Sequence, residues 1–284
     1  TKLPMEFFET LEDFVSIEVH QNLNEGTTEL KQPKYWETLR KRFSKFLPDK
    51  FNVKVPLPEG TVMKPPETPE EHDIAAHLPY AELIGAMAYP AVHTKLEIRY
   101  AISLLSRYMH NWTLEHWDLA IQVLMYCISS KEIGVMFSRG LDRHGVNVLS
   151  AFADANYPRP PERSGGCSIV MCNGAAIHLS AKQHTTIDTS TTTSELTEQY
   201  LCSNHVMGFR NMMCEMGLTV DSPTVIYQDN KPAIEIANNQ RTMSDSTKHM
   251  DVRVFKIRER IEDQEVYLEY CRTVMMTADI GTKA

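Results

Sequence analysis

The chain has 284 residues, of which 42% are hydrophobic and 23% are charged, and these proportions are typical of a globular protein of one or two domains. No apolar run approaches the roughly 20 residues of a membrane helix, so we expect no membrane contact. The net charge of −8 argues against a simple nucleic-acid-binding protein, unless acidic residues gather around cations or basic residues gather on one face.

The N-terminal part begins with an expected strand and a basic helix. Residues 14–19 alternate in polarity and predict a strand. Residues 33–46 predict a helix, because a proline is tolerated in its first turn and apolar side chains recur at helical spacing. Arg40, Lys41 and Lys45 make this helix the densest basic patch of the chain. The patch is interpreted either as a solvated helix face or as a contact for nucleic-acid phosphates.

A proline-rich segment, residues 48–79, follows and predicts a semi-rigid linker. Three helices are expected after it, at about 80–92, 97–110 and 113–129, because apolar residues recur every three or four positions. Thr113 is suited to cap the third helix. Together these segments predict a small helical bundle.

After residue 140 the pattern changes to alternating strands and helices. The expected elements in chain order are strands at 146–153, 168–171 and 176–179, a long helix at 194–216, a strand at 225–228, helices at 232–238 and 251–262, and a strand at 266–270. This order indicates an α/β domain with a mixed sheet.

Four carboxylates fall near the ends of these elements. Asp154 follows the first expected strand, and Glu195 lies in the first turn of the long helix. Asp229 follows the strand at 225–228, and Asp279 lies in the C-terminal tail. If they converge at one edge of the sheet, such carboxylates need a cation, and oxygen ligands select Mg²⁺ or Mn²⁺. Taken singly, each acid is better explained as a helix cap or a surface carboxylate.

A series of short motifs follows from residue 80 onward, each occurring once in that range. They are Tyr-Ala-Glu-Leu-Ile-Gly at 80–85, Thr-Lys-Leu-Glu-Ile at 94–98, Phe-Ala-Asp-Ala at 152–155, Lys-Gln at 182–183 with the hydroxyl-rich run after it, Gln-Asp-Asn-Lys-Pro at 228–232, Thr-Lys-His-Met-Asp at 247–251 and Ala-Asp-Ile-Gly-Thr-Lys at 278–283. In this order they resemble the reverse transcriptase thumb and ribonuclease H region that ends a copia-type retrotransposon Pol polyprotein.

The resemblance implies a domain organisation and a fold class. Residues 1–22 would be a remnant of the polymerase palm, residues 23–140 a helical thumb-like module, and residues 146–284 a ribonuclease H-like domain. The expected fold is α/β, a ribonuclease H-like mixed five-stranded sheet with flanking helices behind the helical module. No Tyr-x-Asp-Asp motif occurs, so this chain alone is not expected to polymerise DNA.

The resemblance also implies an activity. Asp154, Glu195, Asp229 and Asp279 match the four metal-binding acids of the family, with Glu198 as the alternative if the second motif is aligned differently. They would hold two Mg²⁺ (or Mn²⁺) ions and hydrolyse the RNA strand of an RNA–DNA hybrid. The expected partners are the hybrid and the polymerase portion of the same polyprotein.

Further contacts and alternatives stay open at this point. Lys248 and His249 open the helix at 251–262 and are either part of a capped helix or contacts for the hybrid backbone. The competing functional class is a catalytically inert, co-opted nucleic-acid-binding or assembly module, and a third is a related nuclease with another substrate. Six cysteines without a Cys-x-x-Cys pair predict reduced thiols and an intracellular location, cytoplasmic or nuclear.

Overall fold

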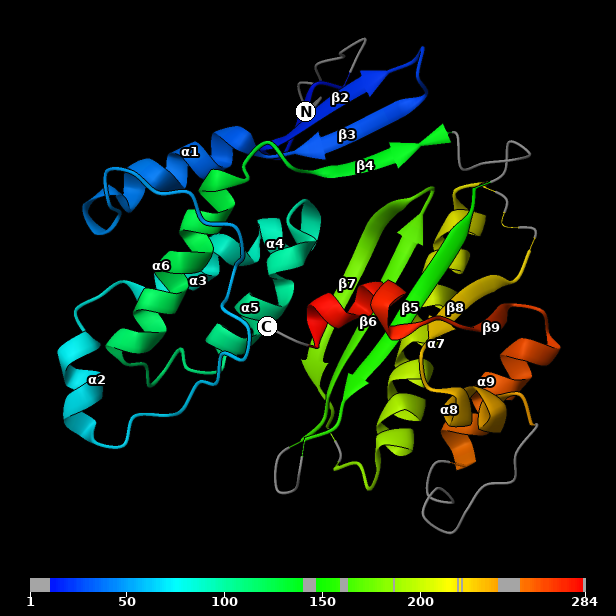
Figure 1. Ribbon diagram of the computed structural model, residues 1–284. Coiled ribbons are helices and arrows are strands. Elements are labelled where there is room, and N and C mark those ends of the chain that lie inside the picture. Colours follow the sequence, from blue (N-terminus) through cyan, green and yellow to red (C-terminus); the bar gives the residue numbers. More distant parts are fainter. Residues whose placement is uncertain are drawn as a thin grey trace, which may run out of the picture.

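The computed structural model describes residues 11–139, 147–158, 163–185, 187–218, 220, 222–239 and 251–282. It contains a helical part with a small sheet and, beside it, a second part built on a five-stranded sheet (Figure 1). None of the helices in the described residues is long and apolar enough to span a membrane.

The small sheet is antiparallel and joins both ends of the helical part. Its strands are β1 (Asp13–Phe14), β2 (Ile17–Asn22), β3 (Thr27–Lys31) and β4 (Val135–Ser138), in the order β1-β2-β3-β4. The single strand predicted at 14–19 is wrong, because Val15 (φ 53°) and Ser16 (φ 63°) form the turn of a hairpin. The predicted boundary between the palm remnant (residues 1–22) and the helical module (residues 23–140) falls within the β2–β3 hairpin.

Six helices form the bundle between β3 and β4. They are α1 (Pro33–Arg42), α2 (Pro69–Ala75), α3 (Tyr80–Ala88), α4 (Pro90–His93), α5 (Arg99–Ser106) and α6 (Leu114–Ser129). The helix predicted at 80–92 is divided at Pro90, and a 3₁₀ turn precedes α5. The backbone N–H of Thr113 donates to His116 Nδ1 (3.1 Å) at the start of α6, at the predicted cap.

The proline-rich segment is not a free linker. It contains α2, and Leu57 and Met63 are buried in the same core as Trp36 and Leu83. The hydroxyl of Tyr108 donates to the Met63 carbonyl (2.8 Å), which ties the segment to the end of α5. The prediction of a linker is therefore wrong, because the apolar residues between the prolines have a core to join.

The second part is a mixed five-stranded sheet. Its strands are β5 (Leu149–Asn156), β6 (Gly165–Cys172), β7 (Ala175–Gln183), β8 (Thr224–Gln228) and β9 (Val266–Tyr270). They lie in the order β7-β6-β5-β8-β9, with β6 antiparallel to both neighbours and with β5, β8 and β9 parallel. The helices are α7 (Thr191–Glu215), α8 (Lys231–Ala237) and α9 (Asp251–Glu262). The predicted fold class, a ribonuclease H-like mixed sheet with flanking helices behind a helical module, is confirmed.

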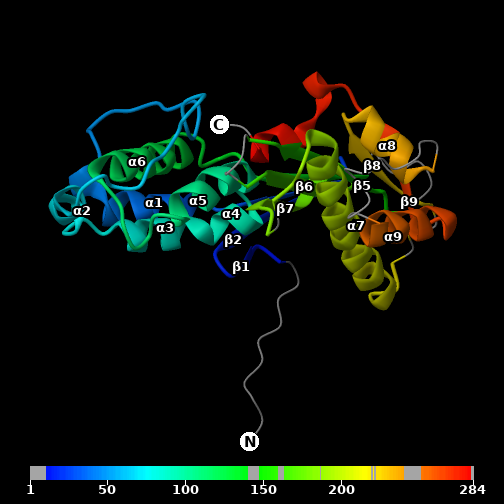
Figure 2. The ribbon, with the colours of Figure 1, turned by 90° about the horizontal axis from the view of Figure 1, so that it is seen from below.

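The two faces of this sheet are covered differently (Figure 2). On one face, Cys202 and Val206 of α7 pack on Ala151 and Val170. On the other face, a second apolar cluster holds the 3₁₀ turn Thr277–Gly281 together with part of the helical bundle. Its members include Leu96, Ile169, Leu179, Ala181 and Ala278. The bundle therefore rests on the five-stranded sheet through buried apolar contacts.

Candidate functional site

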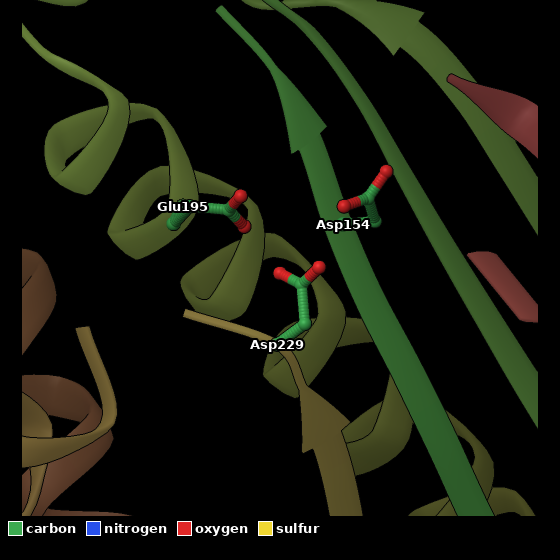
Figure 3. Close-up of side chains that lie close together, drawn as sticks. All are labelled: Asp154, Glu195 and Asp229. Atoms are coloured by element: carbon green, nitrogen blue, oxygen red, sulfur yellow. The ribbon is translucent and has the colours of Figure 1, made fainter. Parts of the chain in front are cut away.

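Three of the predicted acids lie together near one end of the five-stranded sheet. One carboxylate oxygen each from Asp154, Glu195 and Asp229 lies within 4.8 Å of the others. The three side chains point toward a shared space between β5, α7 and the residue that follows β8 (Figure 3). Asp154 and Glu195 are only 4% and 3% exposed, so this is not a group of surface acids.

The strand register brings the two aspartates together. Phe152 of β5 pairs with Tyr227 of the parallel strand β8. Asp154 and Asp229 each come two residues later, so they emerge side by side on the same face. The strand β5 extends to Asn156, so Asp154 lies within the strand and not after it as predicted.

Glu195 reaches the site from the long helix. This helix begins at Thr191, where the Thr193 N–H donates to the hydroxyl of Ser190 (3.2 Å), the N-cap residue. Glu195 therefore lies in the second turn, and its predicted place in the first turn is wrong. The helix dipole falls off within the first turn, so it does not explain a buried carboxylate at this position.

The electrostatics of the site favour a bound cation. Burial, together with the negative charges of Asp154 and Asp229, raises the pKa of Glu195 to about 9. The Gln228 side-chain amide donates to Glu195 Oε2 (3.2 Å) and to its carbonyl (3.1 Å), which fixes the carboxylate but does not supply a counter-charge. Three converging hard oxygen ligands fit a divalent cation such as Mg²⁺ or Mn²⁺.

Asp279 is outside this three-carboxylate group. It lies in the 3₁₀ turn Thr277–Gly281 and is partly exposed. The tail contacts the group through Thr282, whose hydroxyl donates to Asp154 Oδ2, and through Thr273, whose hydroxyl donates to Asp229 Oδ2 (2.7 Å). The role predicted for Asp279 as a fourth metal ligand stays a prediction.

Glu198, the alternative for the second acid, lies in a different cluster that the sequence pattern did not reveal. His184 bonds through Nδ1 to Asp188 (2.7 Å) and through Nε2 to Glu198 (3.2 Å), and all three side chains are buried. Burial alone lowers the pKa of His184, but the hydrogen bonds and charges of both carboxylates outweigh it and raise the pKa to about 9. The cluster is therefore a buried imidazolium between two carboxylates, and Glu198 is not aimed at the three acids.

A glycine on β6 makes room for the buried histidine cluster. A Cβ at Gly166 would collide with Glu198 Oε2 and His184 Nε2, whereas a Cβ at Gly165 would meet nothing within 4 Å. We expect Gly166→Ala to lower the free energy of unfolding by about 1–3 kcal/mol, the usual result of overpacking. Gly165→Ala is the matched control and should be near neutral in the same urea titration. Equal losses in both variants would contradict this role for Gly166.

The basic residues predicted to bind nucleic acid lie elsewhere. Arg40 and Lys41 are on α1, Lys45 follows that helix, and α1 is at the end of the bundle away from the five-stranded sheet (Figure 1). Arg40 lies over the Phe51 ring (5.9 Å) and Lys45 over the Phe46 ring (4.6 Å), so both also make contacts within the chain. Lys248 and His249 are outside the described residues.

Comparison with curated proteins confirms the predicted resemblance to retrotransposon Pol polyproteins. The chain is 27% identical over 259 residues to the retrovirus-related Pol polyprotein from transposon TNT 1-94 of Nicotiana tabacum, a match that covers 89% of this chain and 19% of that protein. It is 26% identical over 213 residues to the Pol polyprotein from transposon RE2 of Arabidopsis thaliana, covering 72% and 14%. The chain thus spans a fifth or less of these relatives. No protein-family model matches it.

Comparison with solved structures returns ribonucleases H and a reverse transcriptase. The structure of LC11-RNase H1 in complex with an RNA/DNA hybrid aligns with a TM-score of 0.38 and 10% identity, over 47% of this chain and 92% of that one. The foamy viral protease-reverse transcriptase in complex with double-stranded DNA aligns with a TM-score of 0.41 and 15% identity, over 72% and 35%.

Proposed function

We propose that this chain hydrolyses the RNA strand of RNA–DNA hybrids in a reaction that requires divalent cations held by Asp154, Glu195 and Asp229. The observation that carries the proposal is the convergence of these three carboxylates from β5, α7 and the end of β8. The convergence arises from the register of β5 against β8 and from the position of α7 in this chain. It is therefore an observation separate from the family resemblance.

The side chains of the site have distinct tasks in this proposal. A bound Mg²⁺ or Mn²⁺ pair would lower the pKa of the attacking water and neutralise charge on the leaving oxygen. Asp154 and Asp229 supply the ligand oxygens from the rigid sheet, and Glu195 supplies one from the buried helix. Gln228 holds Glu195 by its amide, so that the carboxylate presents a fixed oxygen. Asp279 is proposed as a further ligand from the tail.

The substrate and the wider context follow from the similarity to Pol polyproteins. The RNA–DNA hybrid is the substrate that this similarity implies, and the polymerase portion of such a polyprotein is the proposed partner. Selecting RNA requires contact with the 2′-hydroxyl and with the shape of the hybrid.

A comparison of substrates tests the proposed function. The purified chain is incubated in Mg²⁺ and then in Mn²⁺ with end-labelled RNA–DNA hybrid, duplex DNA and duplex RNA of one sequence. We expect cleavage of the RNA strand of the hybrid, leaving 5′-phosphate and 3′-hydroxyl ends, and little cleavage of the two homoduplexes. Preferred cleavage of either homoduplex would reassign the substrate, and binding of the hybrid without any cleavage would favour an inert binding module.

A further inference from the structure

A polar groove lies between the helical bundle and the five-stranded sheet. Its volume is about 420 Å³, and it has three walls. One wall is the stretch 61–63 of the proline-rich segment, the second is α5 with the residues that follow it, and the third is the edge of the sheet at the ends of β5, β6 and β7. The Tyr108–Met63 hydrogen bond holds the first two walls together.

The charge of this groove is opposite to that of the protein. Its lining includes the exposed cations Arg107, Arg163 and Lys182 and includes no aspartate or glutamate, although the chain carries a net charge of −8. None of the three cations forms an ion pair with any residue that the structure describes. Three unneutralised cations in a lining that holds no acid create a local positive potential that attracts an anionic ligand.

The groove opens directly beside the three-carboxylate site. Thr282 lines the groove, and its hydroxyl donates to Asp154. Asn156 also lines it and lies on β5 two residues beyond Asp154, which is about 7 Å along the strand and on the same face. A polyanion bound across the carboxylates would therefore reach the groove about 7 Å further along β5.

We infer that this groove binds the sugar–phosphate backbone of the nucleic acid next to the scissile position, with Arg107 from the bundle and Lys182 and Arg163 from the sheet side as phosphate contacts. The inference rests on the proposed function, because it assigns the ligand class of a surface continuous with that site. It gives the helical bundle a direct part in substrate binding through Arg107, which follows α5, and not through the basic patch on α1. Such contacts give affinity without sequence preference.

The salt dependence of binding tests this assignment independently of catalysis. Binding of a fluorescent RNA–DNA hybrid is measured by anisotropy in EDTA, where no cleavage occurs, at several salt concentrations. The slope of log K against log salt falls by about 0.9 for each phosphate that the protein no longer neutralises. The double variant Arg107→Gln/Lys182→Gln should therefore lower the slope by about 2, and Arg163→Gln alone by about 1.

A control of matched charge separates the groove from net charge. Lys50→Gln/Lys54→Gln removes two exposed cations from the segment after α1, outside the groove, and should leave the slope unchanged. The inference would be overturned if the groove variants left the slope unchanged or if both double variants reduced it equally. Absence of binding by the wild-type chain would overturn it as well. A wild-type chain that binds through the groove but cleaves nothing in Mg²⁺ or Mn²⁺ would refute the proposed function and leave this inference standing.

Discussion

Replacing Glu195 by Gln is expected to lower hybrid cleavage by at least about 100-fold while making the metal-free protein more stable. Even partners that only orient a metal ligand contribute 10- to 100-fold, so loss of a ligand itself should cost no less. The variant also removes a carboxylate buried beside two like charges. Cleavage rates and thermal midpoints in EDTA, measured on the same preparations, give both quantities.

The pH dependence of the stability of the metal-free chain provides a second test of the buried Glu195 carboxylate. The pKa of Glu195 is raised from 4.5 to about 9 in the folded chain, so the folded state binds more protons than the unfolded state between these values. The metal-free wild type should therefore lose stability as the pH rises from about 4.5 to 9. Glu195→Gln should show a flatter profile, because the titrating group is absent.

Glu198→Gln is the matched control for this prediction. Glu198 lies three residues further along α7, is buried to the same degree, and bonds to His184 instead of facing the other acids. Its replacement should reduce stability but leave most of the cleavage activity at temperatures where the variant is folded. The opposite pattern, with activity lost only in Glu198→Gln, would mean that the second metal ligand is Glu198 and that the alternative alignment is correct.

Replacing His184 by Gln is expected to cause the largest loss of stability, about 3–5 kcal/mol, because it leaves Asp188 and Glu198 as uncompensated buried charges. His20→Gln is the control, since His20 is 52% exposed and pairs with Glu18 at the surface (3.5 Å); its loss should be within about 1 kcal/mol. Urea unfolding at pH 6 measures both. A loss below about 1 kcal/mol for His184→Gln would show that the buried cluster contributes little.

The pH profile of stability identifies the charged form of His184. Its pKa is raised from 6.5 to about 9 in the folded chain, so its contribution is fully present below pH 6.5 and is lost as the pH rises through about 9. The difference in stability between wild type and His184→Gln should therefore shrink over this range. A difference that is constant from pH 6 to 9 would mean that the histidine acts by packing alone.

Most strands and helices of the second part could be predicted from the sequence because their signals are local. The alternation in β8 and the helical spacing in α9 are properties of short windows. The hairpin at Val15 and Ser16 was missed because the turn residues fit the alternation of the flanking strands. The packing of the proline-rich segment was missed because composition does not show which core its apolar residues join.

The candidate site was predictable only in part, because its geometry depends on tertiary packing and not on local sequence patterns. Motif order suggested Asp154, Glu195 and Asp229, but their convergence depends on the register of β5 against β8 and on where α7 begins. The buried His184 cluster joins a loop, a strand end and a helix, and no periodic pattern encodes that meeting. The groove likewise exists only because α5 packs beside β7, which requires tertiary structure.

The most direct test of the central claim is cleavage of an RNA–DNA hybrid by the wild-type chain beside Asp229→Asn in Mg²⁺ and Mn²⁺. Asp229 accepts a hydrogen bond from Thr273 (2.7 Å), and an asparagine carbonyl can keep it, so the variant removes a charge with little change in shape. We predict that the wild type cuts the RNA strand and that the variant does not. Cleavage that persists in Asp229→Asn, or a folded wild-type chain that is inactive with both metals, would contradict the claim.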